Sequence, residues 1–232
     1  MAANSREFDG IIAATESPRE SSIPVKWARG GKIREHEVLL VANGVGWSRA
    51  AAGVDTACPE FRPDAVISTG FCGACDPKLD IGDVVVATEV QCCGPDATPL
   101  SSPFPAVSPA QSHPYSGPIA SIDHVAQTAK EKAALHAGGA IAVEMEASAV
   151  AKACETRGLP FYCVRSVTDL AGEDMENDFN RALRSDGQLD TMLIFSHALH
   201  HPVTRMPELI RLRQNSIRAA RTLGDFFADC RF

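Results

Sequence analysis

The chain has 232 residues, of which 45% are hydrophobic, and its mean hydropathy is close to zero, so we predict a globular protein with a large core and no stretch that spans a bilayer. The formal net charge of −7 excludes a basic nucleic-acid-binding surface as the main feature and favours a small-molecule ligand. The N-terminus lacks the apolar core of a signal peptide, so we expect a cytoplasmic protein whose Cys residues stay reduced.

An apolar run at 8–15 ends in a polar turn, a pattern typical of a short buried strand. The segment that follows, 16–20, contains Arg19 and Glu20, residue types that can bind an anion or protonate a leaving group. The alternative is a solvated turn that leads into a helix, and these residues alone do not separate the two interpretations.

Two further strands are predicted at 25–29 and 33–41, with Gly30 and Gly31 as the turn of a hairpin between them.

Gly44 and Gly46 then interrupt the chain before an Ala-rich helix at 48–57. Glycines between a strand and a helix N-terminus let backbone amides approach an anion, which the helix dipole also favours. A single Gly-x-Gly is weak evidence for such a site.

A third buried strand is predicted at 64–70, with a small-residue turn at 71–74. Cys72 and Cys75 form a Cys-x-x-Cys pair, but a four-Cys zinc site needs a second pair, and the Cys pair at 92–93 has the wrong spacing. We therefore favour buried thiols over a metal or redox site.

A strand at 82–90 precedes a segment rich in Pro, Ser, Gly and Ala at 93–116, which predicts a long loop that is either functional or a passive surface excursion. Another strand at 117–122 ends at Asp123 and His124, and we interpret His124 as a solvated residue at a helix start.

The central stretch of the chain begins with Glu144 and Glu146 and continues at helical spacing as far as Gly158, a stop signal. A β-branched and aromatic run at 161–167 then predicts a buried strand that ends beside Asp169. Ligands of α/β proteins bind at such strand ends. The alternative for the two Glu is a solvated helix N-terminus, where the dipole favours carboxylates.

Beyond Asp169 the chain is polar as far as residue 190, which predicts a loop beside the site. Two amphipathic helices are predicted at 189–199 and 207–227. The acidic charge of the chain favours a helix that closes the core over a helix that lies on a membrane surface.

Residues 143–147 (VEMEA) and 165–169 (RSVTD) resemble the signature of the superfamily of nucleoside phosphorylases and methylthioadenosine/S-adenosylhomocysteine nucleosidases. Residues 123–135 (DHVAQTAKEKAAL) and the C-terminal extension are most similar to the hopanoid-associated phosphorylases. The resemblance implies a three-layer α/β/α sandwich with a mixed central sheet, in a single domain spanning 1–232 with a helical extension at 190–230.

The resemblance also implies roles for individual residues. Asp169 protonates the leaving base, Glu146 accepts hydrogen bonds from ribose hydroxyls, and Met145 packs on the sugar. The implied set is catalytic Asp169 and Glu20; substrate-binding Glu144, Met145, Glu146, Asp123 and Gly73; and phosphate-binding Arg19, Gly44, Gly46, Arg49, Thr69 and Gly70.

Phosphorolysis of a purine nucleoside is the activity that this interpretation favours, because Arg19 and Arg49 could hold phosphate. Hydrolysis is the alternative, with Glu20 activating water, although Glu20 lies two residues from the position of the nucleosidases' Glu. Phe71 stands where the family has Ser, which also admits a catalytically silent nucleoside-binding module.

The expected partners are a nucleoside and inorganic phosphate as co-substrate, with no cofactor, metal or nucleic acid. The most similar subfamily suggests an adenosyl-hopanoid, a lipid-linked substrate that would admit membrane contact. A homo-oligomer is expected by resemblance.

Overall fold

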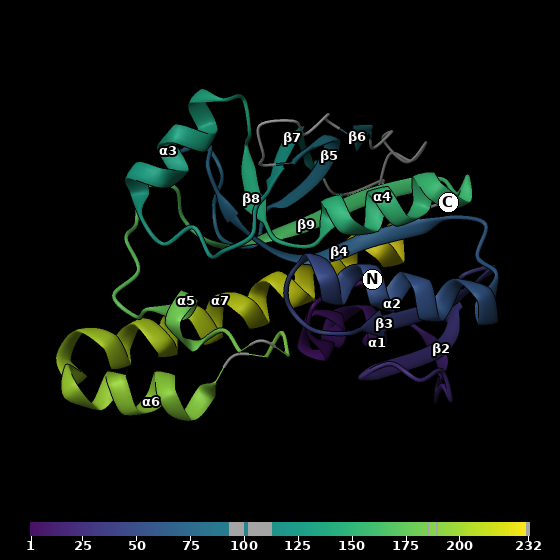
Figure 1. Ribbon diagram of the computed structural model, residues 1–232, viewed down its shortest axis with the longest axis horizontal. Coiled ribbons are helices and arrows are strands. Elements are labelled where there is room, and N and C mark those ends of the chain that lie inside the picture. Colours follow the sequence, from purple (N-terminus) through teal and green to yellow (C-terminus); the bar gives the residue numbers. More distant parts are fainter. Residues whose placement is uncertain (93–99, 102–112, 185, 189, 231–232) are drawn as a thin grey trace.

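The computed structural model describes residues 1–92, 100–101, 113–184, 186–188 and 190–230 (Figure 1). The helices are the 3-10 helix η1 (Ser5–Phe8), α1 (Asp9–Ala13), α2 (Trp47–Phe61), α3 (Ala129–Ala137), α4 (Ala147–Arg157), α5 (Phe179–Ala182), α6 (Thr191–His200) and α7 (Pro202–Asp229). The strands are β1 (Glu16–Glu20), β2 (Trp27–Ile33), β3 (His36–Ala42), β4 (Val66–Ala74), β5 (Val84–Cys92), β6 (Leu100–Ser101), β7 (Tyr115–Ser121), β8 (Ala142–Glu144) and β9 (Phe161–Asp169).

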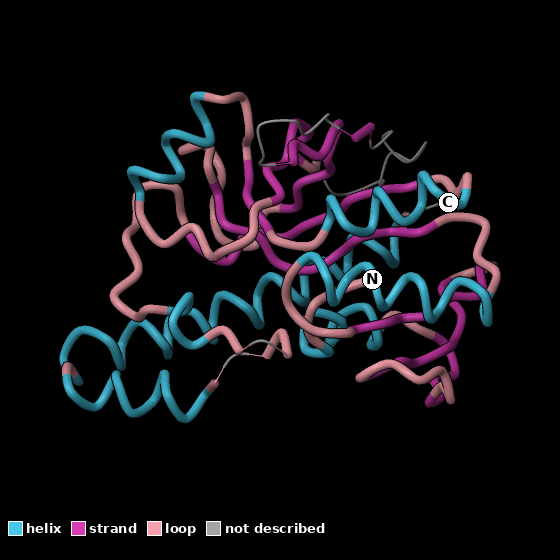
Figure 2. The backbone as a smooth tube through the Cα atoms, in the orientation of Figure 1, coloured by secondary structure: helices cyan, strands magenta, loops and turns pink. Residues whose placement is uncertain are grey.

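A mixed sheet in the order β6-β5-β7-β8-β4-β9 lies at the centre of the molecule. The pairs β4–β9, β5–β7 and β7–β8 are parallel, whereas β4–β8 and β5–β9 are antiparallel. Because β9 pairs with β5 as well as with β4, the sheet curls back on itself into a small barrel. A separate antiparallel sheet, β1-β2-β3, lies at one edge of the molecule (Figure 2).

Alternate residues of β5 face two different helical layers. Val85 and Ala87 pack into the core that α2 and α4 cover, whereas Val84 and Val86 pack into the core that α1 and α7 cover. This alternation follows from the pleat of a strand, which points successive side chains to opposite faces. The predicted three-layer α/β/α architecture with a mixed central sheet is therefore confirmed (Figure 1).

Helix α4 and strand β9 follow the sequence pattern closely. The C-cap of α4 is Gly158, whose φ of 65° is left-handed and whose N–H bonds to carbonyls of the last turn. Glycine adopts this conformation without a Cβ clash. Strand β9 is buried along most of its length and ends at Asp169, so this carboxylate lies at the carboxyl end of a strand, as predicted.

The predicted strand at 8–15 is wrong, because Phe8 ends η1 and residues 9–13 form α1. Asn4 caps η1 by accepting a hydrogen bond from the Arg6 N–H, and Glu7 follows three residues after the cap, an arrangement typical of a helix start. A short apolar run does not by itself distinguish a strand from a helix.

The predicted hairpin forms, but its turn lies at residues 34–35 and not at Gly30 and Gly31. Gly31 lies within β2, where a Cβ would stand 2.4 Å from Thr15 Cγ2, so close packing explains this glycine. The predicted turn at 71–74 is likewise part of a strand, because β4 runs unbroken to Ala74.

Helices α6 and α7 correspond to the two predicted C-terminal helices. Leu223, Phe226 and Phe227 of α7 are buried in the core, which confirms that this helix closes the core. Helix α6 and the start of α7 form a hairpin at one end of the molecule (Figure 1). Within the described residues, no helix is both long enough and apolar enough to cross a bilayer.

Two predicted loops have different outcomes. The loop predicted at 93–116 lies mostly outside the described residues, although strand β6 within it pairs with β5. The loop predicted between Asp169 and residue 190 contains the short helix α5.

Candidate active site

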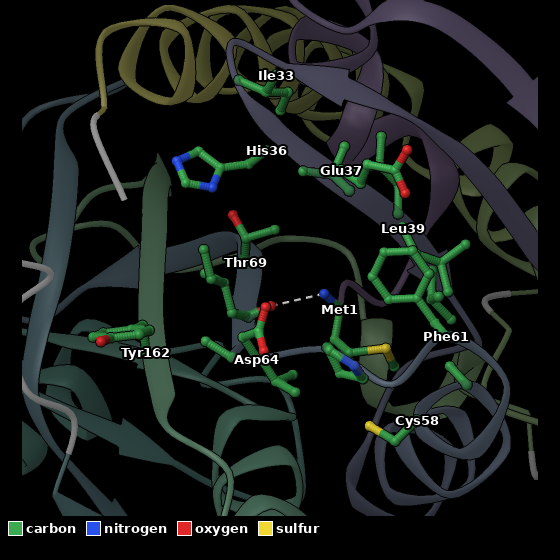
Figure 3. Close-up of a pocket in the computed structure, with 18 of the residues that line it drawn as sticks. Met1, Ile33, His36, Glu37, Leu39, Cys58, Phe61, Asp64, Thr69 and Tyr162 are labelled. Atoms are coloured by element: carbon green, nitrogen blue, oxygen red, sulfur yellow. Dashed lines mark hydrogen bonds between the residues drawn. The ribbon is translucent and has the colours of Figure 1, made fainter.

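A cavity of ≈ 760 Å³ lies between β3 and β4 (Figure 3). Met1 is one of the residues that line it and donates a hydrogen bond from its α-amino group to the Ile67 carbonyl at 2.7 Å, while Ala2 pairs with Ala42 of β3. Among the site residues predicted from the sequence, only Thr69 lines this cavity. The cluster of buried charged residues that the sequence pointed to is therefore a separate feature.

Arg165 is the centre of that cluster. Its side chain is fully buried, and its Nη1 donates to the Thr69 carbonyl at 2.8 Å. Its Nη2 donates to Ser68 Oγ at 2.8 Å and also to a Glu144 carboxylate oxygen. Glu146 Oε2 lies 3.8 Å from the same Nη2. The guanidinium thus ties β4 and β9 to the turn between β8 and α4.

Glu144 positions the start of α4. Besides the bond from Arg165, its carboxylate accepts the Glu146 N–H at 2.9 Å and the Ala147 N–H at 2.8 Å. The first amides of a helix lack partners within the helix, and a carboxylate there satisfies them and is favoured by the dipole. These bonds give Glu144 a positioning role at the start of α4, and its contact with the substrate stays a prediction.

Glu146 is held with its carboxylate beside the N-terminus of α2. Its Oε1 accepts the backbone N–H of Gly46 at 2.9 Å, so the structure brings Gly46 to the site as a donor to Glu146. Burial, together with the neighbouring Glu144 carboxylate, raises the pKa of Glu146 to about 7. Met145, between the two Glu, is also buried.

Glu7 joins this cluster, although the sequence analysis did not single it out. Its carboxylate packs on Gly70, where a Cβ would stand 1.9 Å from Glu7 Oε2 and 2.9 Å from Arg165 Nη1. Glu7 Oε2 is buried and has no hydrogen-bond partner within the described part of the chain. Burial, and next the charge of Glu146, raise the pKa of Glu7 to about 8. A buried oxygen without a partner indicates a place for a polar ligand or water.

Asp169 lies further along β4, against Gly73. Its Oδ2 accepts a hydrogen bond from Lys132 Nζ at 2.5 Å, and its Oδ1 accepts one from Thr168 Oγ1 at 3.1 Å. A Cβ on Gly73 would stand 2.7 Å from Asp169 Oδ2, so the glycine makes room for the carboxylate. Burial raises the pKa of Asp169, and the Lys132 ammonium opposes that effect.

The two halves of the cluster are spaced along one strand. Gly70, against Glu7, and Gly73, against Asp169, are three positions apart on β4, a distance of about 10 Å at the rise of an extended chain. The cluster therefore extends along β4 from Glu7 at one end to Asp169 at the other.

Comparison with known proteins places the chain in a family. Residues 14–192 match the phosphorylase superfamily. The chain belongs to the phosphorylase superfamily. It is 29% identical over 177 residues to the 5′-methylthioadenosine/S-adenosylhomocysteine nucleosidase of Staphylococcus aureus strain JH9, an alignment that covers 66% of this chain and 77% of the relative.

Solved structures of nucleosidases share the fold. The S-adenosylhomocysteine nucleosidase of Streptococcus pyogenes, in complex with 5-methylthiotubericidin, has a TM-score of 0.71 and 22% identity, covering 98% of this chain and 92% of that chain. The Campylobacter jejuni 5′-methylthioadenosine/S-adenosylhomocysteine nucleosidase has a TM-score of 0.73 and 19% identity, covering 98% and 94%. Glu7 lies outside the residues that match the superfamily, and only the fold brings it to the site.

The structure does not bring Arg19 and Glu20 of this phosphorylase-superfamily enzyme to the cluster. Both lie on β1, every residue of which is exposed. The reason is that the chain begins with the helices η1 and α1. The chain passes the site at Glu7, and by residue 16 it has reached the edge of the small sheet. The catalytic role of Glu20 and the phosphate contact of Arg19 stay predictions that the arrangement of the cluster does not support.

The remaining predicted residues lie around the cluster. Gly44 and Arg49 stay beside the N-terminal turn of α2 and pack against the segment 186–188, where a Cβ on Gly187 would stand 2.8 Å from Arg49 Cγ. Asp123 is exposed and its carboxylate lies 2.7 Å from His124 Nδ1, away from the buried groups.

Two features that bore on function in the sequence analysis form no part of the charged cluster. Phe71 packs against the core that α1 and α7 cover, so it does not occupy the charged cluster. Cys72 and Cys75 are buried, as predicted, and burial raises the pKa of the Cys75 thiol to about 12.

Proposed function

We propose that this enzyme hydrolyses the N-glycosidic bond of a purine nucleoside, with water as the acceptor of the sugar. The observation that carries the proposal is Glu7, a buried carboxyl group with an unpartnered oxygen beside Glu146 and Arg165. A carboxylate with a raised pKa takes a proton from water more readily than an ordinary one.

The buried cluster supplies groups for both sides of the glycosidic bond, the sugar and the base. Positive charge builds on the sugar as the bond breaks, and Glu146 can accept hydrogen bonds from the ribose hydroxyls while Met145 covers the sugar. Glu7 takes the proton of the attacking water. Asp169, about 10 Å along β4, meets the base as it leaves.

The charges of the cluster favour water over phosphate. Glu7, Glu144 and Glu146 surround a single guanidinium, and Arg165 already donates to Thr69, Ser68 and Glu144. An incoming phosphate dianion would be repelled by the carboxylates. With Arg19 on the exposed strand β1, the phosphorolysis favoured by the sequence has less support than hydrolysis, which was its alternative.

The substrate class we propose is an adenine nucleoside with a substituent on the 5′ carbon, because the similar curated relatives are named for methylthioadenosine and S-adenosylhomocysteine. An adenosyl-hopanoid stays an untested prediction, as does the homo-oligomer. The catalytically silent nucleoside-binding module also stays an untested prediction, although the Phe71 side chain packs into the core and does not fill the cluster.

The deciding experiment measures adenine release from methylthioadenosine and S-adenosylhomocysteine by chromatography, with and without inorganic phosphate. We expect equal rates in both conditions and a free 5′-substituted ribose as the second product. Release that requires phosphate and yields a ribose 1-phosphate would overturn hydrolysis. No release from either nucleoside, under both conditions, would overturn the proposed substrate class.

We also expect the rate to depend on pH around neutrality. Glu7 acts as a base only when ionised, and its pKa is raised to about 8, so kcat/KM should rise with pH and level off above about pH 8. A Glu with the ordinary pKa of 4.5 would place this limb near pH 4.5. Glu146→Gln removes a neighbouring negative charge and should shift the limb to lower pH. A constant kcat/KM from pH 5 to 9 would contradict the role of Glu7.

A further inference from the structure

Lys132 is unusual among the lysines of this chain because its side chain has an exposed fraction of 0%. It lies on α3 and reaches inward, where its Nζ donates to Asp169 Oδ2 at 2.5 Å and to the Leu170 carbonyl at 2.9 Å. Lysines on helices ordinarily extend their ammonium to water. A buried ammonium is costly unless it is paired, so the pairing with Asp169 holds Lys132 in place.

The pairing changes what Asp169 can do. A carboxylate that faces an ammonium at hydrogen-bond distance carries a negative charge and has no proton of its own to give. The leaving purine nevertheless needs a proton, because departure as an anion is unfavourable. The proton therefore has to reach Asp169 from a neighbouring group, and Lys132 is the only cation for which the described part of the chain shows a bond to it.

We propose that Lys132 supplies, through Asp169, the proton that the leaving base takes up; this inference rests on the nucleosidase function proposed above. As the bond from C1′ to the base nitrogen breaks, its electron pair goes to the base. Asp169 gives a proton to the base and receives one from Lys132 Nζ. Glu7 takes the proton of the attacking water. Lys132 ends neutral, Glu7 ends protonated, and exchange with solvent restores both, so charge and atoms balance.

The other ionisable groups beside Lys132 and Asp169 do not supply this proton. Cys72 and Cys75 face it from β4 and the turn that follows, but burial keeps both as neutral thiols by raising their pKa values. Glu173, downstream of β9, and Glu131, on α3, are carboxylates and add only negative charge nearby. Lys132 itself does not touch the substrate, so it is a positioning and proton-supplying residue.

The test compares Lys132→Met, which keeps the length of the side chain, with Lys130→Met, which lies on the exposed face of the same helix. Each variant is assayed on methylthioadenosine and on its N7-methylated form, whose base already carries positive charge and leaves without protonation. We expect Lys132→Met to lower kcat on methylthioadenosine by about 10²-fold, the scale of one proton-transfer contribution. Its kcat on the N7-methylated nucleoside should change by less than about threefold, and Lys130→Met should be unchanged on both substrates.

Reading both substrates in the same preparation separates chemistry from folding, because loss of folded protein lowers both rates equally. Equal losses on the two substrates, or no loss on either, would overturn the role of Lys132 and leave the nucleosidase function standing. A wild-type protein that releases base from neither nucleoside would overturn the proposed substrate class, and this inference with it.

Discussion

Glu7→Gln is expected to abolish most of the base-releasing activity, lowering kcat by about 10²- to 10⁴-fold, the range attributed to a positioned general base. Gln keeps the size of the side chain and can still occupy the space above Gly70, but its amide cannot take a proton from water. The measurement is adenine release from methylthioadenosine at pH 8.5, where the wild-type carboxylate is ionised.

The matched control is Glu20→Gln, at the other Glu that could activate water. Glu20 is exposed on β1, so we expect its rate to stay within about twofold of wild type, as for a surface change that touches no site group. A Glu7→Gln enzyme with wild-type activity, or a larger loss in Glu20→Gln, would return the catalytic role to Glu20.

Glu7→Gln should also change the thermal stability of the protein, which gives a second, independent measurement. Glu7 has a folded-state pKa of about 8, above the 4.5 of a free Glu, so the folded protein holds a proton that the unfolded chain loses between these pH values. Ionised Glu7 therefore destabilises the fold increasingly as pH rises from about 4.5 to 8. Glu7→Gln should raise the melting temperature at pH 8.5 and change it little at pH 5. This is the exchange of stability for activity that active sites commonly show.

Sequence patterns predicted the elements whose signals are local. Helix α4 was predictable because apolar residues recur at helical spacing and Gly158 supplies the left-handed cap. Strand β9 was predictable because a short β-branched run follows, and Asp169 at its end was therefore identified correctly as lying at a strand's carboxyl end.

The residues that sequence analysis missed depend on contacts between distant segments. Glu7 meets Arg165 and Gly70 only because η1 packs against the sheet, and its local signal was the spacing of Asn4 and Glu7 typical of a helix cap. Lys132 has no pattern that separates it from a surface lysine of an amphipathic helix. Its partner is 37 residues away in sequence.

The glycines of β4 also show that sequence analysis misses contacts between distant segments. Gly73 was expected in a turn and Gly70 at the end of a strand, whereas the structure places both within β4, where the missing Cβ atoms leave room for two carboxylates. Sequence alone shows that a position is small but does not show what lies against it.

Arg165→Met is expected to be the most destabilising single change in the cluster. It removes the only cation bonded to Glu144 within the described residues and leaves Glu144 and Glu146 buried without their partner. Breaking a buried ion pair on one side costs about 3–5 kcal/mol, which corresponds to a fall of about 6–20 °C in melting temperature for a chain of this size. Thermal unfolding at pH 8 measures the effect.

The control for Arg165→Met is Arg157→Met, because Arg157 pairs with Asp55 at 2.7 Å on the surface, with side chains 30% and 59% exposed. A surface pair contributes about 0–1 kcal/mol, so this variant should melt within a few degrees of wild type. If the cost at Arg165 is electrostatic, the double variant Arg165→Met/Glu144→Gln should recover part of the lost stability, because it removes one of the unpaired carboxylates. Equal melting temperatures for the single and double variants would instead attribute the loss to packing, and the carboxylates would then not depend on Arg165 for their burial.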